Sequence, residues 1–163
     1  MTTSGSDTAQ GPAQAVLTYL RARYPILYLV SHEQTRVERA LMGVAQAMAM
    51  DLVFWSITTG LTDPTGAPLE ASPDYRDPVA ALRWVLGKPK RMLVVLRDLH
   101  AFLAPPAPDR LVVRSLGDLS RELRVTRTDE ARSLVLLAPA LQLPDQRGRA
   151  HGGAGRPPAE VRP

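Results

Sequence analysis

The sequence predicts one three-layer α/β domain, in which a mainly parallel sheet of four strands lies between helices on both faces. Two observations predict this fold. Four apolar runs within residues 13–143 are only four or five residues long, which suits buried strands better than helices. They cover residues 26–30, 52–55, 92–96 and 134–138. Segments with helical apolar spacing alternate with them, which is typical of parallel strands joined by right-handed crossovers.

The bulk composition is that of a globular domain. The 163 residues are 45% hydrophobic and 22% charged, with a formal net charge of +4. The absence of cysteine excludes disulfides, thiolate metal sites and a thiol nucleophile, and the three histidines have no metal-ligand spacing. No apolar run approaches the roughly 18 residues of a membrane-spanning helix, and the N-terminus has no apolar signal core. We therefore expect a cytoplasmic protein without a membrane partner.

The first half of the chain contains two of the predicted strands. Residues 1–12 are small and polar, which predicts disorder. A helix is expected from Ala13, after Pro12, until Pro25 stops it before the strand at 26–30. Ser31 is then expected to cap the second helix, with Gln34 completing a capping box. After the strand at 52–55, residues 56–61 lead off its end into a loop of weak pattern.

The second half contains the central strand. Asp77 is expected to cap a helix that starts at Pro78, and the apolar run at 92–96 follows it. Five apolar residues in a row predict a strand buried on both faces, in the middle of the sheet. Asp109 should cap the longest helix, which precedes the strand at 134–138. Residues 144–163 have no apolar periodicity and a net charge of +2, so we expect a disordered basic tail.

Candidate functional residues lie where the strands end, because ligands of open parallel sheets bind at the carboxyl ends of the strands. These candidates are Ser31, Glu33, Arg97, Asp98 and His100. A phosphate-binding loop after the first strand needs glycines and a lysine, and residues 31–36 contain neither. Glu33, in the first turn of the next helix, also opposes an anion. We therefore expect a topology like that of a P-loop NTPase, but without a Walker A loop.

The central strand resembles a Walker B strand, with Asp98 close to the position that holds magnesium. Arg97 stands where an acid is expected, and it would repel magnesium or pair with Asp98. The last strand ends in Ala138 and Pro139 instead of a polar residue. We therefore expect no enzyme activity, no metal and no cofactor. ATP with magnesium is the one cofactor that such a degenerate site would take.

Two other patterns have both a functional and a structural interpretation. Asp98 and His100 could form a general acid/base pair, but no nucleophile accompanies them, and capping and local packing explain them more simply. Arg110, Arg114 and Arg121 share one face of the longest helix and could bind an acidic partner. The mild net charge argues against nucleic acid as that partner.

Four segments also carry a family resemblance. They read RARYPILYLVSHE (21–33), WSITTGL (55–61), VLRDLHAFL (95–103) and LGDLSREL (116–123). Together they resemble the N-terminal domain of uncharacterised AAA+ ATPases that are encoded in cyanobacteria, some algal plastids and other bacteria. The resemblance spans residues 13–143 and implies a RecA-like, catalytically degenerate domain that precedes a true ATPase module.

In that family a complete AAA+ module follows this domain, whereas this chain continues into the expected tail, so the resemblance does not imply ATPase activity here. The chain is either a stand-alone or truncated relative, or its ATPase partner is a separate chain. We expect a non-catalytic interaction domain that assembles with an AAA+ ATPase chain or with itself. The alternative is a ligand-sensing domain that binds a nucleotide or another anion through Ser31, Arg97 and Asp98.

Overall fold

The computed structural model describes residues 7–69 and 73–141, which form one five-stranded sheet. The strands are β1 (Ile26–Val30), β2 (Asp51–Ser56), β3 (Gly60–Thr62), β4 (Met92–Arg97) and β5 (Arg132–Ala138). They lie in the order β1-β5-β4-β2-β3. All neighbours are parallel except β3, which is antiparallel to β2. The predicted α/β fold with a mainly parallel sheet is confirmed.

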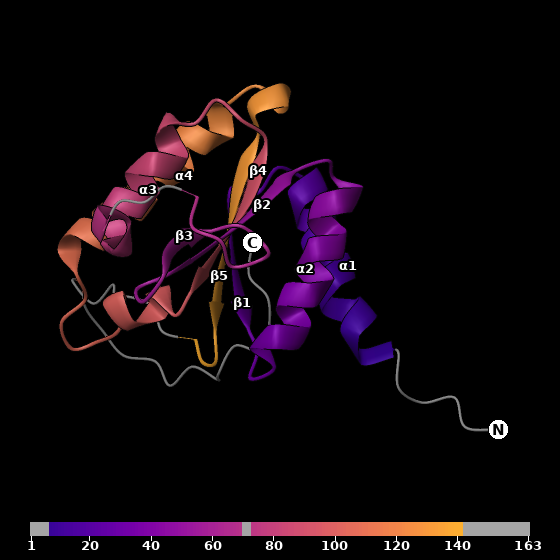
Figure 1. Cartoon of the computed structure of the whole chain (residues 1–163), viewed down its shortest axis with the longest axis horizontal. Coiled ribbons are helices and arrows are strands. Elements are labelled where there is room, and N and C mark those ends of the chain that lie inside the picture. The colour runs from indigo at the N-terminus through magenta and orange to yellow at the C-terminus, as the bar shows by residue number, and fades with distance from the viewer. Residues whose placement is uncertain (1–6, 70–72, 142–163) are drawn as a thin grey trace, which may run out of the picture.

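Helices cover both faces of the sheet, as predicted. They are α1 (Asp7–Arg21), α2 (Gln34–Ala47), α3 (Pro78–Gly87) and α4 (Arg110–Val125), with short 3-10 turns η1 (Pro73–Arg76), η2 (Leu99–Phe102) and η3 (Thr128–Glu130). Figure 1 shows α1 and α2 on one face and α3 and α4 on the other. Each pair buries its own hydrophobic cluster against the sheet, and alternate residues of β4 and β5 face opposite clusters.

Strand β4 lies between β5 and β2, and Met92–Leu96 are at most 2% exposed. This confirms that the central apolar run is buried on both faces. The predicted caps are also present. Asp77 accepts a hydrogen bond from the Val79 amide (3.0 Å), and Asp109 accepts one from the Leu111 amide (2.8 Å). Among the described residues, no helix is both long and apolar enough to cross a membrane.

The fifth strand, β3, corrects the expectation of four. Residues 56–61 do not simply leave the sheet, because the chain turns back at Gly60 and pairs with the end of β2. Gly60 has a φ of +69°, and a side chain there would lie 3.4 Å from the Tyr75 carbonyl carbon. Three residues are too few to show a strand pattern in the sequence, which is why β3 was missed.

Helix α1 also begins earlier than predicted, at Asp7 instead of Ala13, so residues 7–12 are helical and not disordered. Pro12 lies inside the helix. A proline near the start of a helix removes one hydrogen bond, and burial of Val16 and Leu20 helps to hold the rest. The predicted disorder of residues 1–6 and of the tail at 144–163 falls outside the described residues.

Candidate functional site

The connections that follow β1, β2, β4 and β5 meet along one side of the sheet, which we call the carboxyl edge. It comprises residues 31–34, 56–59, 97–100 and 138–140. Four of the five sequence-predicted site residues lie in these connections and Arg97 is the last residue of β4, so the topology brings all five to the same edge. Their contacts determine whether the edge retains a binding site.

The connection from β1 to α2 consists of residues 31–33 only. The Ser31 amide donates to the Ala138 carbonyl (2.9 Å), and the Ser31 hydroxyl accepts from the Glu33 amide (3.1 Å). Ser31 therefore forms a local turn, and the predicted cap and capping box are wrong: Glu33 is the N-cap and makes no side-chain capping bond. A cap at Ser31 would start the helix at residue 32, but α2 starts at Gln34. The Ser31 hydroxyl is already hydrogen-bonded within the turn that precedes the helix.

This short turn cannot act as a phosphate loop. Such a loop places about four residues between its first glycine and the glycine-lysine pair, so that several amides can surround the phosphates. Here the Glu33 carboxylate lies at the start of α2 and pairs with Arg36 (3.1 Å). A negative side chain at the positive end of the helix opposes the binding of a phosphate there.

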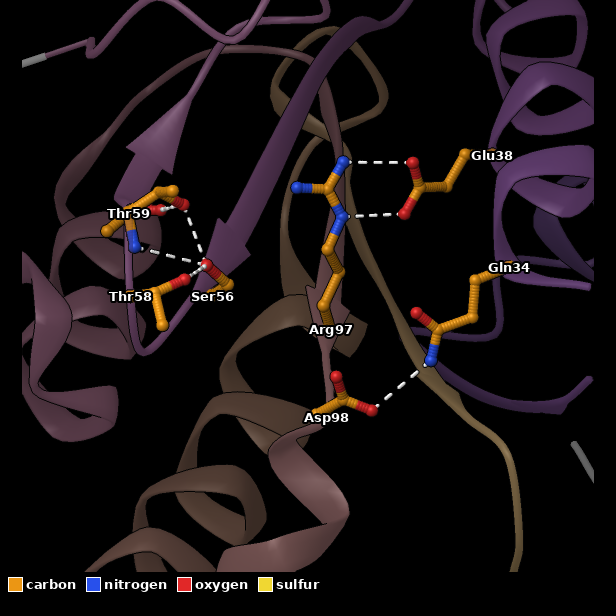
Figure 2. Close-up of polar contacts among 8 residues, drawn as sticks. Gln34, Glu38, Ser56, Thr58, Thr59, Arg97 and Asp98 are labelled. Carbon is orange, nitrogen blue, oxygen red and sulfur yellow. Dashed lines mark hydrogen bonds and ion pairs between the residues drawn. The ribbon is translucent and has the colours of Figure 1, made fainter. Parts of the chain in front are cut away.

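Arg97 at the end of β4 forms the strongest polar contact of the edge. Its Nε donates to Glu38 Oε1 (2.6 Å) and its Nη2 to Glu38 Oε2 (2.9 Å), in a two-pronged ion pair with α2 (Figure 2). The guanidinium carbon also lies 4.5 Å from the centre of the buried Phe54 ring. The sequence-based alternatives were repulsion of magnesium or pairing with Asp98, and the pairing with Asp98 is wrong.

Asp98 instead turns toward the start of α2. Its Oδ1 accepts a hydrogen bond from Gln34 Nε2 (3.2 Å), and its amide donates to the Leu137 carbonyl (3.0 Å). The residue has a left-handed backbone (φ 55°, ψ 20°), which aspartate tolerates better than most residues do. The carboxylate is exposed, but its nearest partner is an amide and not a cation.

His100 does not form an acid/base pair with Asp98. Its Nδ1 lies 3.8 Å from Asp98 Oδ1, which is beyond hydrogen-bond distance, and it has no hydrogen-bond partner among the described residues. Without that bond, the aspartate does not orient the imidazole. The geometry therefore supports local packing of His100 within η2.

The hydroxyl groups after β2 bind one another. Ser56 Oγ lies 3.0 Å from Thr58 Oγ1 and 2.7 Å from Thr59 Oγ1, and it accepts from the Thr59 amide (3.1 Å). Figure 2 shows this cluster on the side of Arg97 away from α2. The hydroxyls close the β2–β3 turn, which explains their presence without a ligand.

The hollows in the described part of the chain also do not suit a nucleotide at this edge. The one that reaches Ser31 and Glu33 has a volume of about 220 Å³, is lined mainly by apolar side chains of α1 and α2, and is smaller than typical ligand pockets. A hollow of about 750 Å³ lies elsewhere, beside Met42, Met50 and Lys90. The described residues also contain no group of three acidic or histidine side chains that could hold a metal ion.

The three arginines predicted as a partner face lie on α4 and are exposed. Arg114 and Arg121 both pair with Asp118, at 3.1 and 3.2 Å. Arg110 forms no ion pair within the described residues. The sequence interpretation missed Glu38 and Gln34, because helical periodicity places them on α2 but does not indicate that they face the end of β4.

Comparisons with known proteins agree with the α/β fold described above. Residues 13–147 match the family described as the SpoVK-like AAA ATPase, N-terminal domain. The chain is also 31% identical over 130 residues to the uncharacterized AAA domain-containing protein ycf46 of Guillardia theta. The match covers 77% of this chain but only 23% of that relative. No solved structure matches the chain.

The family match covers most of the chain, and the mainly parallel α/β sheet is consistent with a RecA-like domain. The resemblance predicted from the four sequence segments is confirmed. The chain belongs to the family of SpoVK-like AAA ATPase N-terminal domains.

Proposed function

We propose that this domain is a non-catalytic assembly module that docks onto an AAA+ ATPase, or onto a second copy of itself, and does not hydrolyse nucleotide. The observation that supports the proposal is the ion pair between Arg97 and Glu38. It joins the end of the central strand to α2, the first helix after β1, and thereby ties down the arginine that stands next to the magnesium-binding position of a P-loop NTPase. A domain that keeps this fold but has lost nucleotide hydrolysis can still act by binding other proteins through its surface.

The alternative is nucleotide or anion sensing at the same edge. An incoming phosphate would meet the carboxylates of Glu33, Glu38 and Asp98, and would have to displace Glu38 from Arg97. Loss of a two-pronged, half-buried ion pair opposes such binding. The assembly module is therefore the better-supported function.

The exposed arginines of α4 are the proposed docking face, with Arg110 as its member without an ion-pair partner in the described structure. A protein partner with acidic side chains would compete with Asp118 for Arg114 and Arg121. Because all three side chains are exposed, charge reversal there should leave the fold intact.

The test uses the whole chain and a purified AAA+ module from a longer member of this family. Sedimentation velocity of the mixture should show a complex, and Arg110→Glu with Arg114→Glu should weaken it at least tenfold. Arg83→Glu, an exposed arginine on α3, is the matched control and should not weaken it. If the chain stays monomeric alone and also forms no complex with the module, the proposal is wrong.

A further inference from the structure

The opposite side of the sheet, which we call the amino edge, gathers arginines from three neighbouring strands. Arg23 precedes β1, Arg91 precedes β4, and Arg127 and Arg132 lie before and at the start of β5. Because β1, β5 and β4 are adjacent, these four residues converge although up to 109 positions separate them in sequence (132 − 23). No local pattern in the sequence connects them.

Three of these arginines bind the carboxyl ends of helices. Arg132 Nη1 lies 2.6–3.1 Å from the Val85, Leu86 and Lys88 carbonyls at the end of α3. In the same way Arg91 Nε donates to the Met48 carbonyl after α2 (3.1 Å). Arg23 Nη2 donates to the carbonyl of Thr126, the C-cap of α4. Each guanidinium thus meets the negative end of a helix dipole.

Arg23 and Arg91 also hold the loop before β5 from two sides. Arg23 Nη1 donates to Thr128 Oγ1 (3.0 Å), and Arg91 Nη1 donates to the Thr128 carbonyl (2.8 Å). Within the described residues neither arginine has a carboxylate partner. A helix end carries only about half a negative charge, so much of each guanidinium charge remains uncompensated.

These charges border a shallow, wide-open depression of the surface, lined by Arg23, Arg91, Arg127, Thr128 and Asp129. A second hollow of about 230 Å³ shares Arg23, Arg91 and Thr128, and it reaches the buried Arg132, whose Nε has no hydrogen-bond partner in the described part of the chain. Asp129 is the only acidic residue of either lining. It is neutralised by Arg127, whose Nε donates to Asp129 Oδ1 (3.1 Å). That hydrogen bond raises the pKa of Arg127 and lowers the pKa of Asp129.

We propose that the amino edge binds a small phosphate-bearing anion between Arg23, Arg91 and Arg127. A guanidinium has five N–H donors, and Arg23 and Arg91 each use only two nitrogen atoms for protein contacts. The remaining donors belong to groups whose orientation the helix ends already fix, which lowers the entropic cost of binding. Planar guanidinium groups fit the oxygens of phosphate in pairs.

The experiment titrates pyrophosphate into the whole chain at low ionic strength, with amide chemical shifts as the readout. Saturable shifts at residues 127–129 are the expected result. Arg127→Gln should weaken pyrophosphate binding about tenfold, since it removes one charge-assisted donor and leaves the Asp129 carboxylate without its arginine partner. Asp129→Asn should strengthen binding about threefold, because it removes a competing exposed carboxylate. Opposite responses of two neighbouring residues would not arise from misfolding.

Arg114→Gln is the control, because it removes an equally exposed, ion-paired arginine from α4 and should not change binding. A titration with ADP should shift the same amides, since the phosphates carry the recognition. The proposal is overturned if Arg114→Gln weakens binding as much as Arg127→Gln does, or if a hexaglutamate peptide saturates this edge while pyrophosphate does not. None of these outcomes depends on docking to an AAA+ module, so this proposal and the proposed function fail separately.

Discussion

The two edges of the sheet use arginines in opposite ways. At the carboxyl edge Arg97 and Arg36 each face a glutamate, Glu38 and Glu33. Asp98 there accepts from Gln34, and the Ser56 hydroxyl contacts those of Thr58 and Thr59. At the amino edge Arg23, Arg91 and Arg132 face backbone carbonyls instead of carboxylates. At the edge where this fold class binds nucleotides the arginines are thus paired with glutamates, whereas at the opposite edge three of the four arginines have no carboxylate partner within the described residues.

Helix polarity explains this difference. In a parallel α/β sheet every crossover helix starts at the carboxyl edge and ends at the amino edge. The starts are occupied by the acids Glu33, Asp77 and Asp109, and the ends are bound by arginines. Acids at the helix starts and arginines at the helix ends both stabilise the helices. The same charges oppose anion binding at the carboxyl edge and favour it at the amino edge.

The largest loss of unfolding free energy should come from replacing Arg132, the buried arginine of the amino edge. Arg132→Met leaves the Leu86 carbonyl without its donor and removes one of two donors from the Val85 and Lys88 carbonyls, which keep the Lys88 and Lys90 amides. We expect a loss of about 3 kcal/mol of unfolding free energy. Urea unfolding of this variant measures the loss. Arg83→Met, on the exposed face of α3, should change stability by less than about 0.5 kcal/mol. Equal effects of the two substitutions would show that the carbonyl contacts do not stabilise the fold.

The ion pair of the carboxyl edge should have the next largest effect. The Arg97 and Glu38 side chains are 28% and 19% exposed, so breaking their pair costs less than breaking a fully buried one. We expect Glu38→Ala to lose about 2 kcal/mol, because Arg97 keeps a half-buried charge without a partner. The double variant with Arg97→Met should recover part of that loss. A double-mutant cycle by urea unfolding measures the coupling, and additive losses would contradict it.

A smaller effect is expected from the acidic caps at the starts of the helices. Asp109→Ala removes the acceptor for the Leu111 and Val112 amides and should cost about 1 kcal/mol. Asp109→Asn keeps an acceptor and should cost much less. Thermal unfolding of both variants separates the hydrogen bond from the charge. An identical loss for the two would mean that helix-dipole charge, and not the hydrogen bond, dominates this cap.

The smallest effect on stability is expected from the exposed ion pair between Arg127 and Asp129 at the amino edge. The pKa of Asp129 is lowered mainly by its hydrogen bond to Arg127, so this pair stabilises the fold above the ordinary carboxyl pKa, and its contribution is lost as the pH falls through the lowered value. Arg127→Gln should raise the Asp129 pKa toward that of a free carboxyl. A carbon-detected NMR titration of the side chain measures it. An unchanged pKa would show that Arg127 does not hold the carboxylate.

The sequence predicted the fold well because its signals are local. The short apolar run at 92–96 is sufficient to predict a central strand, and Asp77 and Asp109 act on amides only two or three residues away. The same local reasoning placed Ser31, Glu33 and Arg97 at the correct edge. It failed for Ser31 as a helix cap, because a turn within residues 31–33 uses the serine hydroxyl first.

The contacts that define both edges could not be predicted in this way. The residues Arg97 and Glu38 are 59 positions apart, and Arg23 and Thr126 are 103 apart. Such pairs depend on the order of strands in the sheet and on which face each helix covers. A single sequence predicts the fold class but neither the strand order nor the face that each helix covers. The partners of the arginines can therefore be identified only from the structure.

The most direct test of the account is one amide-resolved NMR titration of the whole chain with ATP and magnesium. If the carboxyl edge is neutralised internally, the amides of residues 31–34 and 97–100 will not shift, and any saturable shifts will lie at residues 127–129. Saturable shifts at residues 31–34 and 97–100 would contradict the central claim, because they would show that a nucleotide displaces Glu38 from Arg97 and occupies the edge where this fold class binds its ligands.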